Sequence, residues 1–217
     1  PSIEADGSIV MGPTEAEKKA EEERLKREEE ARKAAEEAKR AEEERKRQEE
    51  LAKDPANLNY DHDIASYITY YSQRASDYNR NFNMQLACDA INGEIIVPGE
   101  EFSYNDTVLS KRDPNNDYKP AGVISGGKMV NAIGGGICQV STTLFDAALY
   151  SGMTITNRRN HSLKVGYVPA GMDATCSWGT IDFCFRNDLS VPVKIEAVMN
   201  NGTIRTSFWQ SPLRSNH

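Results

Sequence analysis

Three consecutive glycines and an isoleucine precede a cysteine in the stretch IGGGICQVSTTLFDAALYSGM, residues 133–153. From Cys138 onward apolar residues recur at helical spacing, and Gly152 supplies a stop, so the stretch predicts a helix that begins at the cysteine. The first N–H groups of a helix have no partner within it and carry partial positive charge. That charge favours the thiolate, which is the nucleophilic form of cysteine. The position of Cys138 therefore suits a nucleophile for acyl transfer.

The glycines before Cys138 suit the same chemistry. Gly135 and Gly136 have no side chains to block a substrate carbonyl, and their N–H groups, with that of Gln139, could form an oxyanion hole. A glycine-rich loop before a helix also binds phosphate, but the P-loop lysine and the GxGxxG spacing are both missing. A buried structural cysteine is the commonest fate of a free thiol, so residue type alone leaves that alternative open.

A thiol nucleophile needs a general base, and the candidates are His62, His161 and His217. His62 lies at the edge of the expected domain and His217 is the last residue, whereas His161 follows a predicted strand and is flanked by polar residues. We therefore predict a Cys–His pair with His161 as the base. A lone histidine in a loop is, however, more often an ordinary surface residue. Asp173 and Asn160 are both candidates for the third group that would orient the imidazole.

Composition excludes several classes of function. The net charge is −7, so no overall basic field is present to hold nucleic acid. The cysteines show no CxxC spacing and histidines are few, so we predict no metal site, and no cofactor motif is found. No apolar run approaches the roughly 20 residues of a transmembrane helix. The first residue is proline rather than methionine, which is compatible with removal of an N-terminal segment that would carry a membrane anchor.

The N-terminal part of the chain predicts a long charged helix. Residues 13–53 are almost entirely strong helix formers, with acidic residues four positions before basic ones and a capping box at Thr14 and Glu17. Only Leu25 and Leu51 are leucines, so no heptad seam exists. We expect a disordered segment at 1–12 and a single solvated helical stalk at 13–55, about 60 Å long at 1.5 Å per residue. A weak coiled coil or a helix that docks an unknown partner are the alternatives.

Residues 56–217 predict one domain of the α+β class, with a mainly antiparallel sheet and packed helices, because helical patterns come early and strands cluster late. The expected helices cover 76–91 and the stretch after Cys138. The expected strands cover 67–71, 94–97, two short runs within 121–131, 154–156, 164–168, 174–177, 181–185, 191–199 and 203–209. Asn200-Asn201-Gly202 predicts a hairpin between the last two strands, and 111–118 is expected to be a polar loop.

Several stretches together resemble a known family. They are PGEEFSYND (98–106), GGGICQVSTTLFDAAL (134–149), RRNHS (158–162), YVPAGMDATCSWGTIDFCFRN (167–187) and the final NGT turn. Their order and spacing resemble the VanW domain of bacterial cell-envelope proteins, over about residues 67–209. The resemblance implies a VanW-type catalytic domain at 56–217, and places it on the outer face of a bacterial envelope, secreted or anchored to the membrane by a segment outside this chain.

Some members of that family are associated with L,D-transpeptidase activity, which makes 3-3 cross-links in peptidoglycan. The resemblance implies that Cys138 attacks the carbonyl of the third residue of a stem tetrapeptide and expels D-Ala, with His161 as its base. The acyl group then passes to the side-chain amine of a neighbouring stem. Asp173, Arg158, Trp178 and Arg186 also fall on family-typical positions.

Two further sets of residues carry open alternatives. Arg158 or Arg186 could pair with a stem carboxylate, whereas Asp182, Arg186 and Asn187 could instead form a structural turn network. Cys176 and Cys184 depart from the usual family residues and flank an expected turn at 178–179. They could form a disulfide, which would indicate an oxidising compartment. Cys88 is expected in the core.

Three functions compete on these observations. The first is a cysteine L,D-transpeptidase that acts on the peptidoglycan stem tetrapeptide. The second is a non-catalytic module of the same fold that binds peptidoglycan or a partner protein. The third is a cysteine peptidase or amidase that transfers the same acyl group to water. A reactive thiol at Cys138 would favour an enzyme, and a buried, inert one would favour the binding module.

Overall fold

The computed structural model describes residues 2–3, 9–10, 15–51 and 54–211, and the chain separates into two compact units, Pro1–Glu50 and Leu51–His217. In the first unit, β1 (Ser2–Ile3) pairs antiparallel with β2 (Ile9–Val10), and α1 covers Glu15–Leu51. The remaining residues of the 1–12 segment, the expected cap at Thr14, the boundary at 52–53 and His217 lie outside the described residues.

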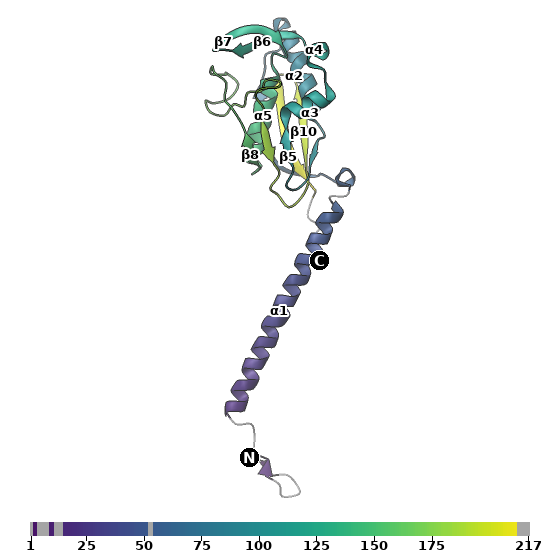
Figure 1. The fold of residues 1–217 in the computed structure, drawn as a ribbon, viewed down its shortest axis with the longest axis vertical. Coiled ribbons are helices and arrows are strands. Elements are labelled where there is room, and N and C mark those ends of the chain that lie inside the picture. Colours follow the sequence, from purple (N-terminus) through teal and green to yellow (C-terminus); the bar gives the residue numbers. More distant parts are fainter. Residues whose placement is uncertain (1, 4–8, 11–14, 52–53, 212–217) are drawn as a thin grey trace. The chain divides into compact units, whose positions relative to one another are not determined.

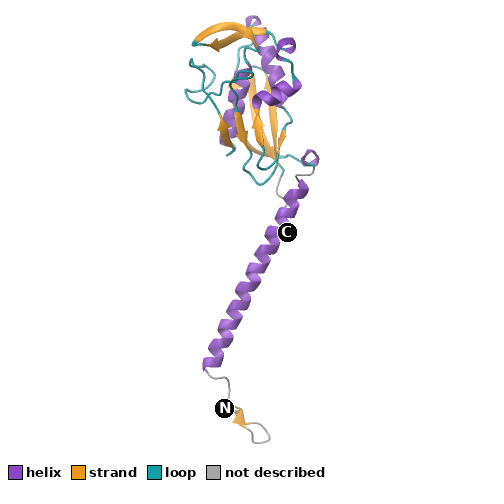
Figure 2. Ribbon diagram, viewed as in Figure 1, coloured by secondary structure: helices purple, strands orange, loops and turns teal. Residues whose placement is uncertain are grey.

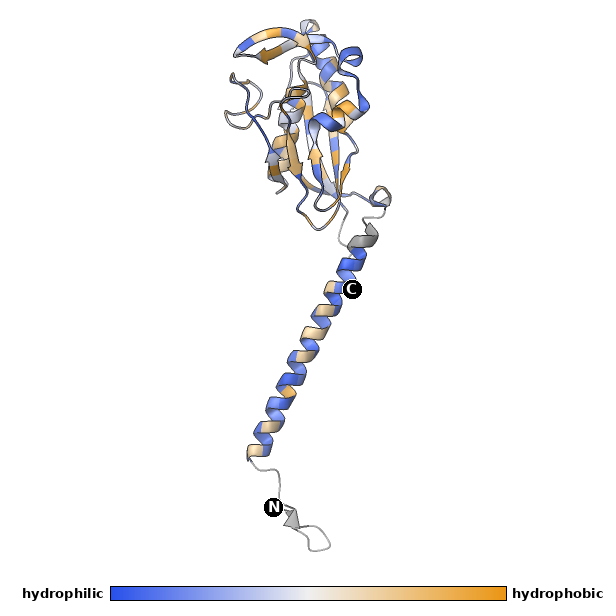
Figure 3. Cartoon of the chain, in the orientation of Figure 1, coloured by the Kyte–Doolittle hydropathy of each residue, from blue (hydrophilic) through white to orange (hydrophobic). Residues whose placement is uncertain are grey.

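Helix α1 confirms the expected long charged helix. Its described side chains from Glu15 to Lys46 are exposed, and Figure 3 shows hydrophilic residues along its length with short, weakly apolar bands between them. Glu29–Lys33 and Glu42–Lys46 form ion pairs of 2.7 and 2.8 Å at the predicted i, i+4 spacing. Each such exposed pair stabilises the helix by about 0.2–0.5 kcal/mol. The described part of α1 is therefore stabilised locally by ion pairs.

The second unit is built on a four-stranded antiparallel sheet in the order β3-β11-β10-β4 (Figure 2). The strands are β3 (His62–Tyr70), β11 (Thr203–Gln210), β10 (Val193–Asn200) and β4 (Ile95–Ile96). The predicted hairpin joins β10 to β11, with Asn200 opposite Thr203. Side chains alternate along β10: Val193, Ile195 and Ala197 are buried, and the residues between them are half-buried or exposed. One face of this sheet therefore carries the core.

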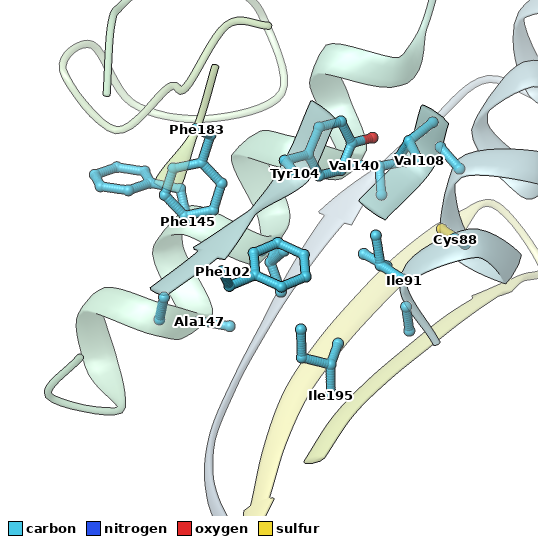
Figure 4. Packing of buried hydrophobic residues seen from close by; sticks show 14 of the residues in the cluster. Cys88, Ile91, Phe102, Tyr104, Val108, Val140, Phe145, Ala147, Phe183 and Ile195 are labelled. Carbon is cyan, nitrogen blue, oxygen red and sulfur yellow. The ribbon is translucent and has the colours of Figure 1, made fainter. Parts of the chain in front are cut away.

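Two helices cover that face (Figure 1). Helix α5 (Ile137–Tyr150) packs against β3 and β11, and α2 (Tyr78–Ile91) packs against β10 and α5. Cys88 on α2 is fully buried in the core, as expected. Figure 4 shows Val140, Phe145 and Ala147 of α5 in one cluster with Phe102, Tyr104 and Phe183. The predicted α+β class and mainly antiparallel sheet are confirmed.

The remaining elements extend this frame. A three-stranded sheet runs β5-β9-β8, and β6 pairs with β7 in a separate hairpin. Their bounds are β5 (Glu101–Ser103), β9 (Cys184–Arg186), β8 (Thr154–Asn157), β6 (Pro120–Ser125) and β7 (Lys128–Ile133). The short helices are α3 (Tyr104–Lys111), α4 (Pro114–Asp117) and the 3₁₀ turns at Pro55–Asn57 and Ala75–Asp77.

Three expectations about these elements were wrong. The polar loop at 111–118 contains α4, because Asp113 caps the N–H of Asn115 at 2.9 Å and Pro114 occupies the first turn. The strands expected at 164–168 and 174–177 do not form. The N–H of Thr175 bonds instead to the carbonyl of Arg159 at 2.8 Å, and Ser177 only bridges Ile181. Both segments have strand-like composition but do not pair with a neighbouring strand of a sheet.

Candidate active site

The glycine-rich turn before α5 fixes the place of Cys138. Gly134 and Gly136 have φ angles of +80° and +112°, a region that side chains other than glycine rarely adopt. These angles turn the chain from β7 into α5, which begins at Ile137. Cys138 is therefore in the first turn of the helix, as predicted, one residue after its start, and its side chain is half-buried.

Polar residues of α5 hold a second segment beside Cys138. The Ser141 hydroxyl donates to the carbonyl of Ala174 at 2.7 Å, and the N–H of Ala174 donates to the Thr142 hydroxyl at 3.1 Å. Ser141 and Thr142 are themselves fully buried. Because both the N–H and the carbonyl of Ala174 are held, Asp173 before it and Cys176 two residues after it are positioned beside α5. Buried hydroxyls on α5 thus supply the backbone of this segment with hydrogen bonds that a neighbouring strand would otherwise supply.

His161 and Asp173 are joined by two hydrogen bonds. Nδ1 of His161 lies 2.7 Å from Oδ2 of Asp173, and the backbone N–H of His161 donates to the same oxygen at 2.6 Å. The His161 side chain is only 6% exposed. Between the two candidates for the orienting group, the structure places Asp173 rather than Asn160 against the imidazole. Since Nδ1 faces Asp173, Nε2 is the nitrogen available to Cys138.

Cys138 and His161 lie close enough for each to shift the pKa of the other. Burial of the His161 ring disfavours its charged form, but its interactions with Cys138 and Asp173 outweigh burial and raise the pKa of His161. The pKa of Cys138 is well below its ordinary value, first because of its hydrogen bond with Cys176 and then because of His161, although burial opposes this. These directions favour a thiolate paired with an imidazolium.

Cys176 is the nearest sulfur to Cys138. The two Sγ atoms are 3.6 Å apart, and the backbone N–H of Cys176 donates to the Cys138 sulfur at 3.5 Å. The carbonyl oxygen of Cys176, 3.3 Å away, accepts from Cys138 when that thiol is protonated. The hydrogen bond raises the pKa of Cys176 well above its ordinary value, so Cys176 stays a thiol and donates. The N–H and thiol of Cys176 thus stabilise negative charge on Cys138, whereas its carbonyl oxygen favours the protonated thiol.

The disulfide considered between Cys176 and Cys184 does not form. All four cysteines are free. Cys176 faces Cys138, whereas the Cys184 thiol donates to the Asp182 carboxylate at 3.2 Å on β9. The turn at 178–179 does not bring their side chains together, and the cysteines give no indication of the compartment.

An open cleft of about 790 Å³ lies over Cys138 and His161. One wall is the β6–β7 hairpin, which presents Met129, Val130 and Ile133 as exposed apolar side chains. The other wall is the loop after β8, from Arg159 to Tyr167. The hairpin and this loop lie at the same end of the domain in Figure 1. The volume is sufficient for a ligand of several residues.

A family model described as "VanW like protein" matches residues 79–209, which include the cysteine turn, His161 and Asp173. The chain belongs to the VanW family. It is 39% identical over 148 residues to "Uncharacterized protein YoaR" of Bacillus subtilis (strain 168), covering 68% of this chain and 48% of that protein. It is 36% identical over 131 residues to "Vancomycin B-type resistance protein VanW" of Enterococcus faecalis (strain ATCC 700802 / V583), covering 58% of this chain and 47% of that protein.

The chain spans about half the length of these curated relatives. No solved structure matches it. Helix α1 lies outside the residues that the family model matches. The features shared with the VanW family are therefore those of the second unit.

Two of the three N–H groups predicted to form the oxyanion hole, those of Gly135 and Gln139, are not placed to do so. Gly135 does not line the cleft; it is buried against β6, and its carbonyl accepts from Asn83 at 2.9 Å. The N–H of Gln139 donates to the carbonyl of Gly136 at 2.9 Å, so it is not free for a substrate. The N–H of Cys138 itself donates to no acceptor within the described part of the chain. Together with Gly136, which does line the cleft, it is the better candidate donor.

Neither arginine expected to bind a stem carboxylate lines the cleft. Arg158 donates to the carbonyls of Asp173 and Gly171 at 2.8 and 2.6 Å and stacks on Phe145, so it braces the loop that carries Asp173. Arg186 is exposed on β9 and pairs with Asp188 at 2.5 Å. Both arginines are occupied within the protein.

Asp182 and Asn187 make structural hydrogen bonds, as the structural alternative for these residues predicts. The Asp182 carboxylate accepts from the N–H of Asn105 at 2.9 Å and from the Ser103 hydroxyl at 2.6 Å. The buried Asn187 amide donates to the carbonyls of Ile96 and Val191, both at 2.9 Å. These residues join loops to strands outside the cleft. Trp178, in contrast, lines the cleft and packs on Gly134 and on Tyr118, with ring centroids 5.1 Å apart.

The structure adds residues that sequence analysis did not identify. Arg80 on α2, Arg159, Lys164 and Tyr167 line the cleft, and Thr175 and Cys176 contact the Cys138 sulfur. Arg159, Tyr167, Thr175 and Cys176 lie within stretches that carry the family resemblance, but their place beside Cys138 depends on the fold. Arg80 and Lys164 lie outside those stretches. Within the described ranges, no group of His, Cys, Asp and Glu side chains is arranged to hold a metal ion. In the same ranges no helix has the length and apolar character needed to cross a membrane.

Proposed function

We propose that this protein is a cysteine acyltransferase of the L,D-transpeptidase type, which forms 3-3 cross-links between peptidoglycan stem peptides. The observation that carries the proposal is the arrangement of Cys138, His161 and Asp173: Asp173 is hydrogen-bonded to His161, Cys138 and His161 shift each other's pKa, and both line an open cleft. A purely structural cysteine needs no base, no orienting carboxylate and no access to solvent. Membership of a family that includes a vancomycin resistance protein supports a role in the cell wall.

The geometry supports a two-step reaction. The Cys138 thiolate attacks the carbonyl carbon of the third residue of a donor tetrapeptide, and negative charge develops on the carbonyl oxygen. The N–H groups of Cys138 and Gly136 are the candidate donors to that oxygen. As the intermediate collapses, the carbon–nitrogen bond breaks and His161 gives its proton to the amine of D-Ala, which leaves as a free amino acid.

The second step reverses these roles. Neutral His161 takes a proton from the side-chain amine of a neighbouring stem while that nitrogen attacks the thioester carbon. The carbon–sulfur bond breaks and the thiolate returns. Asp173 holds the imidazole through Nδ1 in both steps and stabilises the imidazolium without itself being protonated. Cys176 stabilises the thiolate as leaving group.

Mass spectrometry of the protein incubated with purified disaccharide-tetrapeptide tests the proposal, beside Cys138→Ala and a matched Cys184→Ala control. We expect an acyl adduct on Cys138 and cross-linked dimers with the wild type and the control, and neither with Cys138→Ala. Tripeptide stems without dimers would indicate a peptidase or amidase. Binding without adduct or product, equal in all three proteins, would indicate a non-catalytic module.

Such a substrate would place the domain on the outer face of the envelope, with α1 as a spacer or as a docking helix for a partner. Digestion of intact bacteria with an added protease tests this location. Loss of the domain from intact cells supports it, and protection until the cells are lysed contradicts it.

A further inference from the structure

Arg80 presents a guanidinium to the cleft without a carboxylate partner. The residue lies on α2, is half-buried and lines the same cleft as Cys138. Its Nη2 donates to Oε1 of Gln139 at 2.8 Å. In the described part of the chain no acidic group pairs with it, whereas Arg205 pairs with Asp63 and Glu196 at 2.8 and 3.1 Å. The remaining N–H donors of Arg80 are therefore available to a ligand.

The guanidinium is held in place by buried groups. Gln139 is 2% exposed, and its Nε2 donates to the Thr69 hydroxyl at 3.1 Å and to the carbonyl of Tyr70 at 2.8 Å. These bonds fix the amide so that its oxygen faces Arg80. A Cβ at Gly136 would lie 2.9 Å from Cγ of Arg80, so only glycine lets the arginine side chain pass. A preoriented guanidinium loses little conformational freedom when it binds an anion.

The cleft as a whole is positively charged although the chain is acidic. Arg80, Arg159 and Lys164 line it, no Asp or Glu does so among the described residues, and the pKa of His161 is raised. The net charge of the full chain is −7. A cleft of opposite sign to its protein attracts an anionic substrate and orients it.

We propose that Arg80 binds the terminal carboxylate of the residue that leaves the donor stem. The guanidinium is bonded to Gln139, the residue next to the nucleophile, and both line the cleft. In a tetrapeptide the carboxylate nearest the attacked carbonyl is that of the fourth residue, one residue beyond the scissile bond. Arg80 thereby selects stems that end at this residue. The identity of the anion as a stem carboxylate rests on the proposed function. The existence of an anion site in the cleft of Cys138 does not depend on that function.

The anion site can be tested without a stem peptide, by the rates at which iodoacetate and iodoacetamide alkylate Cys138. In both reactions the thiolate sulfur forms a bond to the CH₂ carbon and iodide leaves, so only the charge of the reagent differs. We expect the ratio of the iodoacetate rate to the iodoacetamide rate to fall about tenfold in Arg80→Gln, as for loss of one charge-assisted hydrogen bond. The iodoacetamide rate serves as the internal check that the thiol and the fold are intact.

Two variants make the result specific. Arg74→Gln, on an exposed side chain outside the cleft, should leave the ratio unchanged. Arg159→Gln removes another cation of the same cleft and should lower the ratio less than Arg80→Gln. An equal ratio in wild type and Arg80→Gln, or a larger fall in Arg159→Gln, overturns the proposal.

Stem peptides then test the assignment to the leaving residue. With donor tetrapeptides that end in a carboxylate or a carboxamide, the wild type should prefer the carboxylate in kcat/KM, and Arg80→Gln should lose that preference mainly through KM. Equal use of both donors by the wild type overturns the assignment. If neither donor reacts but the iodoacetate preference still depends on Arg80, the proposed function fails while the anion site stands.

Discussion

Asp146 carries a buried carboxyl group that should make the stability of the domain depend on pH. The residue lies on α5 two turns after Cys138 and is fully buried. Neither carboxyl oxygen has a hydrogen-bond partner among the described residues. Burial raises the pKa of Asp146 to about 7; the charge of Arg158 lowers it and that of Asp173 raises it. We therefore expect Asp146→Asn, which mimics the neutral acid, to remove this dependence on pH.

The sign and size of the change in stability follow from the pKa of Asp146 in the unfolded and folded states. That pKa is 3.8 in the unfolded chain and about 7 in the folded chain, so between these pH values the folded state holds more protons. Stability of the wild type then falls as pH rises, by about 1.4 kcal/mol per pH unit. From pH 4 to pH 7 the loss approaches about 4 kcal/mol, a large part of the 5–15 kcal/mol typical of a domain. Above pH 7 the contribution is constant.

The raised pKa of His161 also lowers stability as pH rises, from its unfolded value of 6.5 through its folded value. That contribution is present in both the wild type and Asp146→Asn, so the difference between the two proteins isolates Asp146. Guanidinium chloride unfolding at pH 5 and pH 8 measures the difference, with Asp106→Asn as a control on an exposed carboxylate.

We expect Asp146→Asn to gain stability over the wild type as the pH is raised from 5 to 8, and Asp106→Asn to follow the wild type. Parallel pH profiles for the wild type and Asp146→Asn would refute the reasoning. An Asp146→Asn variant that is less stable than the wild type at pH 8 would refute it as well, because it would mean that an ionised carboxylate is favourable at this site.

Three further predictions concern the site. Gly135→Ala would place a Cβ 2.5–2.7 Å from backbone atoms of β6, so we expect a loss of about 1–3 kcal/mol in thermal unfolding; Gly166→Ala, with open space around it, should lose much less. Asp173→Asn should cut acyl transfer by about 10²–10⁴-fold, because an amide cannot hold the same imidazole tautomer, and steady-state rates measure this. Dilute hydrogen peroxide should oxidise Cys138 and Cys176 to one disulfide with release of two waters, because their sulfur atoms are adjacent. Mass spectrometry would detect the disulfide as a crosslinked peptide. Protein in which Cys138 alone is oxidised, with no crosslinked peptide, would contradict this prediction.

The sequence predicted which residues meet at the candidate site better than it predicted the elements around them. Cys138 could be placed because glycine and helix signals are local, and His161 because few histidines compete. Asp173 was one of two candidates, since the choice depends on how Ser141 and Thr142 hold the Ala174 peptide unit. No pattern along the chain reports that contact.

The same reasoning explains the failures. Residues 164–168 and 174–177 have the composition of strands, but a strand also needs a neighbour, and α5 supplies side-chain hydroxyls there in place of a sheet edge. Arg158 and Arg186 were assigned to a ligand because they are arginines in matching positions, yet Asp173, Gly171 and Asp188 occupy them. Arg80 lies on a helix with no feature to distinguish it, and only the fold brings it to the cleft.

The three glycines before Cys138 each admit a different neighbour. The Trp178 ring occupies the place of a side chain at Gly134, the backbone of β6 lies against Gly135, and Arg80 lies against Gly136. Trp178, β6 and Arg80 are all parts of the cleft wall. The sequence alone predicts that these glycines let a substrate carbonyl approach their N–H groups. Their contacts indicate that they let three walls of the cleft approach the turn that carries the thiol, so substitution at any of them should move the cleft relative to Cys138 as well as strain the turn.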